Sequence, residues 1–434
     1  MDAAAPAPPR KQMPGGILLS PGVSFGAVGS YFGVIVANVF LTGSIALLLP
    51  FILTASLGVP AGERGQAMGQ LAALQTAAMV TLVAFFGGLA DRFPRRMLLM
   101  ASLVALTLAA ACFPLVKSFT AAALLCLLVG CGQAAMSSGS PALMSDYPDN
   151  ASRGRFVALC FAIQGLTSAL LVAQVTSRIG QVFGDGDKGA ETTLGFWFAA
   201  LVGLLGLAAL IVSVLRTAEK PRGPTASHAL VDVGRNIAKV LRFARDNRRF
   251  RAVLLLSLAF RSDYGIVAGF LTLWISKAPT TDKANLLHAA GSLQTVLWLS
   301  TIVAAFAISY LVDRFDRWRI VCAVLALAAL ALGCAVLIPY PTGLAGLLFV
   351  AGLGVAEGSI VVAVQSLFGQ QTPPELRGSA FGLSYTLGYA FFLPVSLLSG
   401  YLFDHVSPAT PFVVVAAINA LVLLGTVRLL ATSR

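Results

Sequence analysis

Three charged residues stand inside stretches of sequence that are otherwise almost wholly apolar. Arg261 and Asp263 lie within the run from Ala252 to Ile275, and Glu357 lies within LGVAEGSIVVAVQ. A charge in apolar surroundings is costly unless a partner, water or a proton neutralises it. A buried carboxyl group can bind and release protons, and a guanidinium group can hold a carboxylate or phosphate. The alternative for all three is a permanent ion pair that joins helices.

The composition identifies the medium around these residues. Hydrophobic residues make up 57% of the 434, and only 11% are charged, whereas about a quarter are charged in a soluble domain. The mean hydropathy is +0.85. The chain has too few polar residues to cover the surface of a soluble protein of this length. We therefore expect an all-α polytopic membrane protein.

Apolar runs of about 20 residues, long enough to cross a bilayer as a helix, occur twelve times. They form two sets of six, which gives an N-terminal bundle over residues 25–216 and a C-terminal bundle over 251–434. Residues 1–24 are predicted to be a flexible cytoplasmic tail, and 217–250 a cytoplasmic linker with an amphipathic helix. The predicted spans are 27–57, 67–90, 97–116, 120–146, 155–177, 192–216, 251–276, 289–311, 319–339, 343–371, 378–403 and 411–431.

The basic residues predict the orientation, because Lys and Arg accumulate on the cytoplasmic side. If the N-terminus is cytoplasmic, 23 of the 30 basic residues fall in inner segments, six in outer loops and Arg261 in the membrane. Both termini are therefore expected in the cytoplasm, in a protein of the inner or plasma membrane of the cell. This asymmetry explains the net charge of +12, so we expect no nucleic-acid partner. The amphipathic helix is expected to lie on the inner leaflet.

An internal repeat links the two halves. The segment GGLADRFPRR at 87–96 returns as SYLVDRFDRW at 309–318, with Asp313 lying 222 residues after Asp91. Both copies fall in predicted inner loops, between the second and third spans of each half. This pair resembles the loop motif G-x-L-A-D-R-x-G-R-R of the major facilitator superfamily, although Pro94 stands where the family usually has glycine.

The resemblance implies two pseudo-symmetric six-helix bundles around a central cavity that opens to alternate sides of the membrane. It also implies a gating role for the charged residues of the motif, which can cap a helix or bridge to the neighbouring bundle. Positive-inside topology alone is the alternative for the arginines. The predicted gating residues are Asp91, Arg92, Arg95, Arg96, Asp313 and Arg314. Motifs of the superfamily's drug exporters, sugar porters and nitrate carriers are absent, so no subfamily is assigned.

The deep charges then acquire predicted roles. The first, fourth, seventh and tenth helices resemble the family's cavity wall, and these include the helices of Arg261 and Glu357. Arg261 and Asp263 are two residues apart, so they point about 200° away from each other on a helix and are not expected to pair. We predict Glu357 and Asp263 as proton-coupling residues. The predicted substrate-binding residues are Arg261, Asn38, Tyr31, Gln133, Gln294 and Gln365, although hydrogen bonding between helices is the commoner role of such uncharged groups.

We therefore expect a secondary active transporter, coupled to protons, that moves a small organic and possibly anionic solute. An exporter of amphipathic compounds or drugs and an uncoupled facilitator are the alternatives. An enzyme is not expected, because the three histidines fall in separate loops without metal-ligand spacing. We expect no cofactor or metal, and a monomer with a small-molecule substrate, protons and the lipid bilayer as its partners. The sequence does not exclude a receptor on a transporter fold.

Overall fold

The computed structural model describes residues 12–14, 16–90, 94–149, 152–178, 188–216, 229–277, 286–341, 343–373 and 377–431. A few side chains within these ranges, those of Arg261 and Asp313 among them, also lie outside the described part. Over the described ranges the chain is almost entirely helical, and twelve long helical segments begin within a few residues of the predicted spans. The prediction of an all-α fold is confirmed.

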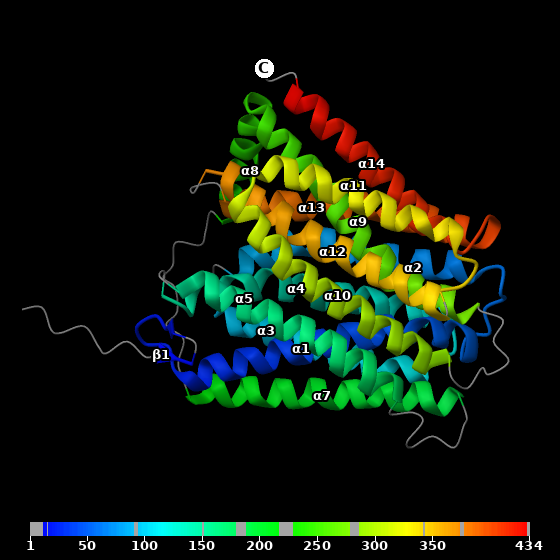
Figure 1. Ribbon diagram of the computed structural model, residues 1–434. Helices are drawn as coiled ribbons and strands as arrows, with labels where there is room; N and C mark the ends of the chain where they lie inside the picture. Colours follow the sequence, from blue (N-terminus) through cyan, green and yellow to red (C-terminus); the bar gives the residue numbers. More distant parts are fainter. Residues whose placement is uncertain are drawn as a thin grey trace, which may run out of the picture.

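The long helices form two bundles (Figure 1). The N-terminal bundle holds α1 (Phe25–Ala55), α2 (Arg64–Ala90), α3 (Arg95–Cys112) with its extension η1 (Phe113–Leu115), α4 (Phe119–Asp146), α5 (Arg153–Leu166) with the π-helix η3 (Thr167–Thr176), and α7 (Lys188–Arg216). The C-terminal bundle holds α9 (Arg248–Ser276), α10 (Leu286–Arg314), α11 (Arg317–Gly333) with η6 (Cys334–Leu337), α12 (Gly343–Gln371), α13 (Arg377–His405) and α14 (Thr410–Ala431).

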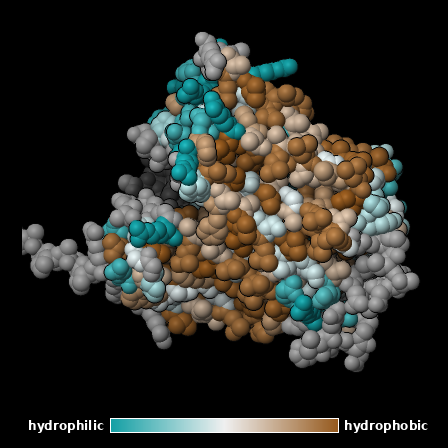
Figure 2. Space-filling view, viewed as in Figure 1, coloured by the Kyte–Doolittle hydropathy of each residue, from teal (hydrophilic) through white to brown (hydrophobic). Residues whose placement is uncertain are grey.

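The protein is a multi-pass membrane protein. In the described part, eleven helices are long and apolar enough to cross a membrane, and α2 occupies the position of the remaining predicted span. Large apolar side chains of these helices, such as Val303 and Leu330, are more than 60% exposed. Apolar residues cover the middle of the face shown in Figure 2, with hydrophilic patches toward its two ends. Such a surface is stable in lipid and not in water.

The first and last described residues, Gln12 and Ala431, lie at one end of the bundles, which we call the terminal end; the opposite end is the far end. At the terminal end, β1 (Gln12–Met13) and β2 (Ile17–Leu18) form a short hairpin. It is held to the α4–α5 connection, where Leu18 N donates to Ser152 Oγ at 2.9 Å and Ser20 N donates to Tyr147 O at 2.9 Å. A flexible tail therefore remains a prediction only for residues 1–11, which lie outside the described residues.

The predicted amphipathic helix is α8 (Ala229–Asp246), at the terminal end. Its Val240 and Ala244 are buried in an apolar cluster with Phe250 and other residues of the C-terminal bundle. The apolar stripe that the sequence assigned to the inner leaflet consists of Leu230, Val233, Ile237, Leu241 and Ala244. Protein takes that place for Ala244, because α8 leads directly into α9 and folds back against it and α13. Leu241, predicted on the same stripe, is 52% exposed.

The two bundles pack backbone to backbone in the far half. A Cβ atom built on Gly69 of α2 would lie 2.5 Å from Ser396 O of α13, and one built on Gly291 of α10 would lie 2.2 Å from Ala173 O of η3. Thr295 Oγ1 of α10 lies 3.0 Å from Ala169 O and accepts a bond from Gln174 Nε2 at 2.5 Å. These contacts give η3 a hydrogen-bond partner outside its own helix. The described parts of the two bundles are therefore in close contact in the far half.

Candidate functional site

Two buried carboxyl groups occupy the middle of the C-terminal bundle. Asp263 is the sixteenth of the 29 residues of α9, and Glu357 is the fifteenth of the 29 residues of α12. Their exposed fractions are 3% and 6%. The two helices are in contact, and the two carboxyl groups interact electrostatically. The sequence predicted both residues for one task, and the structure brings them together at the same depth.

A third helix, α14, contributes a hydrogen-bond donor to this carboxyl pair. Asn419 of α14 is fully buried, and its Nδ2 donates to Asp263 Oδ1 at 2.7 Å and to Val415 O at 3.0 Å. Its Oδ1 is buried without a hydrogen-bond partner among the described residues. Asn419 therefore fixes the Asp263 carboxyl group and leaves one amide oxygen available beside it. Sequence reasoning missed Asn419 because it followed charges, although a lone amide in an apolar helix is a comparable signal.

Glycines set the position of Glu357. Cβ atoms built on Gly354 and Gly358 would lie 2.3 Å from Leu297 O and 2.2 Å from Thr301 O of α10. No side chain fits at either position, so α12 lies directly on the backbone of α10 on both sides of Glu357. Among the side chains that the structure describes, Glu357 has no hydrogen bond or ion pair. Gln294, one turn before Leu297 on α10, is 8% exposed.

Arg261 lies in α9, two residues before Asp263. Its side chain is outside the described part, so its predicted role in binding the substrate stays a prediction.

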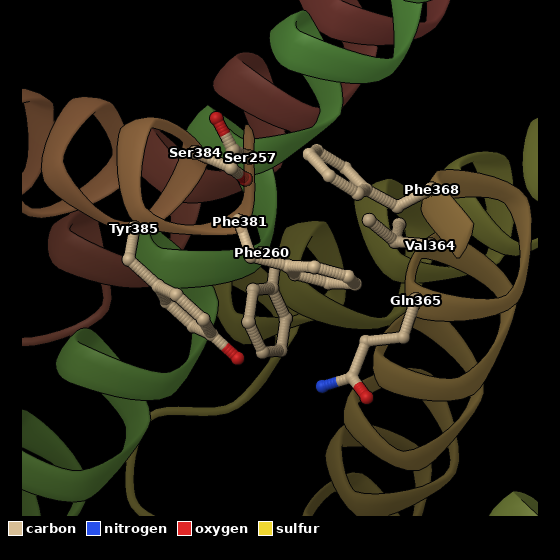
Figure 3. A pocket seen from close by; sticks show the side chains of 8 residues that line it. All are labelled: Ser257, Phe260, Val364, Gln365, Phe368, Phe381, Ser384 and Tyr385. Atoms are coloured by element: carbon tan, nitrogen blue, oxygen red, sulfur yellow. The ribbon is translucent and has the colours of Figure 1, made fainter. Parts of the chain in front are cut away.

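A small hollow, with about 20 Å³ available to the centre of a water molecule, lies between α9, α12 and α13 and is partly open to solvent (Figure 3). Phe368 and Phe381 meet across it with ring centroids 4.5 Å apart. Gln365 faces Phe260 and Tyr385 across the hollow in Figure 3. The lining residues are Ser257, Phe260, Val364, Gln365, Phe368, Phe381, Ser384 and Tyr385. The lining is aromatic with a few uncharged polar groups.

The hollow and the carboxyl pair share their helices. Glu357 and Gln365 are eight residues apart on α12, which is about 12 Å along a helix. Phe260 precedes Asp263 by less than one turn of α9. A solute in the hollow would therefore lie between the carboxyl pair and the terminal end. The sequence predicted Gln365 for the site, but the aromatic residues were missed because apolar side chains within a span carry no distinguishing pattern.

The other predicted polar residues lie elsewhere, in the N-terminal bundle. Tyr31 is buried, and its hydroxyl group is 2.8 Å from Ser140 Oγ and 3.0 Å from Ser140 O. Gln133 Oε1 of α4 accepts a bond of 2.9 Å from Gln75 Nε2 of α2. Asn38 is half-buried in α1, with its Oδ1 unpartnered among the described residues. Of these, Asn38 has a polar atom left to offer a solute.

The predicted gating residues fall at the terminal end. Arg95 of α3 forms an ion pair with Asp146 of α4. Arg96 Nε donates to Tyr147 Oη at 3.2 Å and Arg96 Nη1 to Ser213 O at 3.4 Å. All these partners belong to the N-terminal bundle, so these contacts are not the predicted bridge to the neighbouring bundle.

The structure describes fewer contacts for the remaining predicted gating residues. Arg314 Nη1 donates to Tyr310 Oη within α10. Asp91 and Arg92 lie outside the described residues, and so does the Asp313 side chain. The gating role of the motif stays a prediction. In the described part, no three of the His, Cys, Asp and Glu residues gather in a group that could hold a metal ion.

Comparisons with known proteins cover almost the whole chain. The family model of the Major Facilitator Superfamily matches residues 24–281 and 263–434. The magnetosome protein MamH of Paramagnetospirillum magneticum (strain ATCC 700264 / AMB-1) is 25% identical over 411 residues, which are 90% of this chain and 89% of that protein.

The fold of this chain resembles those of several transporters of known structure. The nucleoside transporter NupG has a TM-score of 0.70 at 14% identity, covering 92% of this chain and 98% of its own. The peptide transporter POT, in complex with sulfate, has a TM-score of 0.70 at 15% identity over 95% and 96%. A POT family transporter in complex with 5-aminolevulinic acid has a TM-score of 0.68 at 14% identity over 93% and 96%. At these identities the likeness shows the fold alone.

Proposed function

Because the chain belongs to the Major Facilitator Superfamily, and is therefore a membrane transporter with a small-molecule substrate, we propose that it is a secondary active transporter driven by protons. The observation that carries this proposal is the carboxyl pair, Asp263 and Glu357, buried together at mid-depth. The site is proposed to bind one proton and to release it as the molecule changes from one open state to the other.

The physical argument rests on charge. Burial in a medium of low dielectric constant imposes a large desolvation cost on each carboxylate, and the charge of Glu357 adds repulsion at Asp263. One proton bound by the pair removes the repulsion and one of the two desolvation costs, and the hydrogen bond from Asn419 Nδ2 to Asp263 Oδ1 stabilises a charge that remains. Exposure of the pair to water on either side would release the proton. A structural pair would stay in one protonation state throughout, and this difference separates the two interpretations.

The direction of the proton path follows from the proposed orientation. The asymmetry of Lys and Arg supports cytoplasmic termini in a protein of the cell membrane, so the terminal end would face the cytoplasm and the far end the outside. Because the two bundles pack backbone to backbone in the far half, we assign the structure to an inward-facing state. Alternating access would require the far contacts to open and the terminal end to close.

The substrate is proposed to be a small organic solute that is bound by the carboxyl pair and the hollow. The aromatic rings of the hollow would stack on an apolar or aromatic part of the solute, and Gln365 would bind a polar group. Arg261 remains the proposed partner of any negative group. The same hollow favours a second candidate, an exporter of amphipathic compounds, because its described lining carries no charge.

The proposal can be tested before the substrate is identified. Ligand-induced thermal shifts of the purified protein across a metabolite and drug collection identify binding compounds, and proteoliposomes with an imposed pH gradient then test each of them. Accumulation that follows the gradient supports proton coupling. Equilibration without accumulation indicates an uncoupled facilitator, and binding without counterflow indicates a receptor. We propose a monomer as the working unit and no enzymatic activity.

A further inference from the structure

A fully buried carboxylate joins the two bundles at the far end. Asp404, near the C-terminus of α13, has a side chain with 0% exposure. Its Oδ1 accepts a bond from Gly65 N at 2.9 Å, and its Oδ2 accepts one from Gln66 N at 2.7 Å. Both donors belong to the first turn of α2, in the other bundle. A residue of the C-terminal bundle thus caps a helix of the N-terminal bundle.

This contact is electrostatically favourable. The first N–H groups of a helix have no partner within the helix, and the helix dipole places partial positive charge there. Hydrogen bonds in which the acceptor is ionised are shorter and stronger than neutral ones. When the far ends separate, α2 loses its cap and Asp404 loses two donors. Water can replace both, so the contact stabilises the closed end without locking it irreversibly.

Lys277, the residue that follows α9, holds Asp404 within its own bundle. Its Nζ lies 3.4 Å from Asp404 Oδ1 and 4.2 Å from the centre of the Phe403 ring. Burial lowers the pKa of the Lys277 ammonium group, and the Asp404 carboxylate opposes that shift. Because Lys277 and Asp404 are both in the C-terminal bundle, their pairing survives opening. Lys277 therefore orients the carboxylate and offsets its charge in both states.

Glycine makes the close approach possible. A Cβ atom built on Gly65 would lie 2.6 Å from Phe403 Cδ1 and 2.7 Å from Gly400 O. One built on Gly400 would lie 2.4 Å from Gly65 O. Any side chain at either position would push α2 away from α13 and lengthen the bonds to Asp404. The two glycines and the charges around Asp404 thus favour the same closed geometry.

We propose that Asp404, with Lys277 and the first turn of α2, is the latch of the far gate, whose release is required for the far end to open. This inference rests on the proposed function, because a gate has a task only in a transporter that alternates between two open states. It places a latch at the end opposite the Asp91 and Asp313 motif. The charge pattern of the sequence did not indicate it, because Asp404 stands alone beside a histidine.

The latch is tested by the reactivity of a buried thiol. Ser396 is 0% exposed, and its backbone carbonyl contacts α2 at Gly69. Ser396→Cys, in a chain whose six native cysteines are replaced, is reconstituted in liposomes and labelled from the far side with an impermeant maleimide. Asp404→Asn should raise the labelling rate about tenfold, which corresponds to about 1.4 kcal/mol. Gly65→Ala should raise it in the same direction by steric separation.

Two matched controls accompany these variants. Ser118→Ala removes a side chain that caps its own helix, through Ala121 N at 3.2 Å, and Gly62→Ala adds a methyl group where no atom lies within 4 Å. Neither should change the labelling rate. If Asp404→Asn does not fold, Lys277→Gln replaces it, with the same expected direction.

An unchanged labelling rate in Asp404→Asn, in its replacement Lys277→Gln or in Gly65→Ala would contradict the proposed latch. The readout needs no substrate. Faster labelling without any pH-driven transport would therefore refute the proposed coupling and leave the latch standing.

Discussion

Asn419 Nδ2 lies 2.7 Å from Asp263 Oδ1 and ties the carboxyl group of α9 to α14. Without this bond Asp263 Oδ1 would be a buried acceptor that has lost its described partner. Asn419→Ala should therefore lower the free energy of unfolding by about 1 to 3 kcal/mol. Denaturant titration of the purified protein in detergent measures the change.

The matched control for that variant is Asn38→Ala, because the Asn38 side-chain oxygen has no partner among the described residues. Its cost should be clearly smaller. Equal costs at the two positions would show that Asn419 contributes packing rather than a hydrogen bond.

A second prediction concerns the contact of α12 with α10. Gly358→Ala places a methyl carbon 2.2 Å from Thr301 O, so it should destabilise the protein by about 1 to 3 kcal/mol through overpacking. It should also displace Glu357 and weaken transport. Gly352→Ala on the same helix meets no atom within 4 Å. Thermal unfolding should find it neutral or slightly stabilising, and a loss there equal to that of Gly358→Ala would contradict the argument.

The hollow makes a third prediction, about binding. Phe381→Ala and Gln365→Leu each remove one of its proposed contacts and should weaken binding of the transported solute roughly tenfold, or about 1.4 kcal/mol. Calorimetry or a thermal-shift titration measures the affinity. Phe306→Ala truncates a ring that is 65% exposed on α10, and it should leave the affinity unchanged. Wild-type affinity in both hollow variants would place the solute elsewhere.

The proposed orientation gives a fourth prediction. A single cysteine at Ala61, in the exposed loop between α1 and α2, should react with an impermeant reagent only from outside the cell. One at Asp246, at the exposed end of α8, should react only from the cytoplasm. The opposite pattern would reverse the orientation and with it the direction of the proton path.

The sequence predicted the spans well because a bilayer imposes a simple rule of length and apolarity, which each helix satisfies alone. It also predicted Asp263 and Glu357, since ions in apolar helices are rare. It did not predict the partners that depend on packing. Asn419 and Asp404 meet Asp263 and Gly65 across 156 and 339 positions of sequence, and only the arrangement of helices joins them.

Packing also decides which predicted polar groups have partners within the protein. The Tyr31 hydroxyl group bonds to Ser140 and Gln133 Oε1 accepts a bond from Gln75, while their role in binding a substrate stays a prediction. The apolar stripe of α8 has the pattern of a membrane-surface helix, and α9 and α13 supply the apolar surface for its buried residues instead. Periodicity shows which face of a helix is apolar and leaves open what covers it.

The central claim is that the carboxyl pair carries the coupling proton, and Glu357→Gln tests it most directly. The amide mimics the protonated carboxyl group permanently, so the variant can still change between its two open states but cannot release a proton. In proteoliposomes it should exchange labelled substrate across the membrane at a rate close to wild type and lose accumulation driven by a pH gradient. Asp263→Asn, measured beside it, shows whether the second carboxyl group shares the task. Wild-type accumulation in both variants would contradict the account, because the proton would then bind elsewhere or not at all.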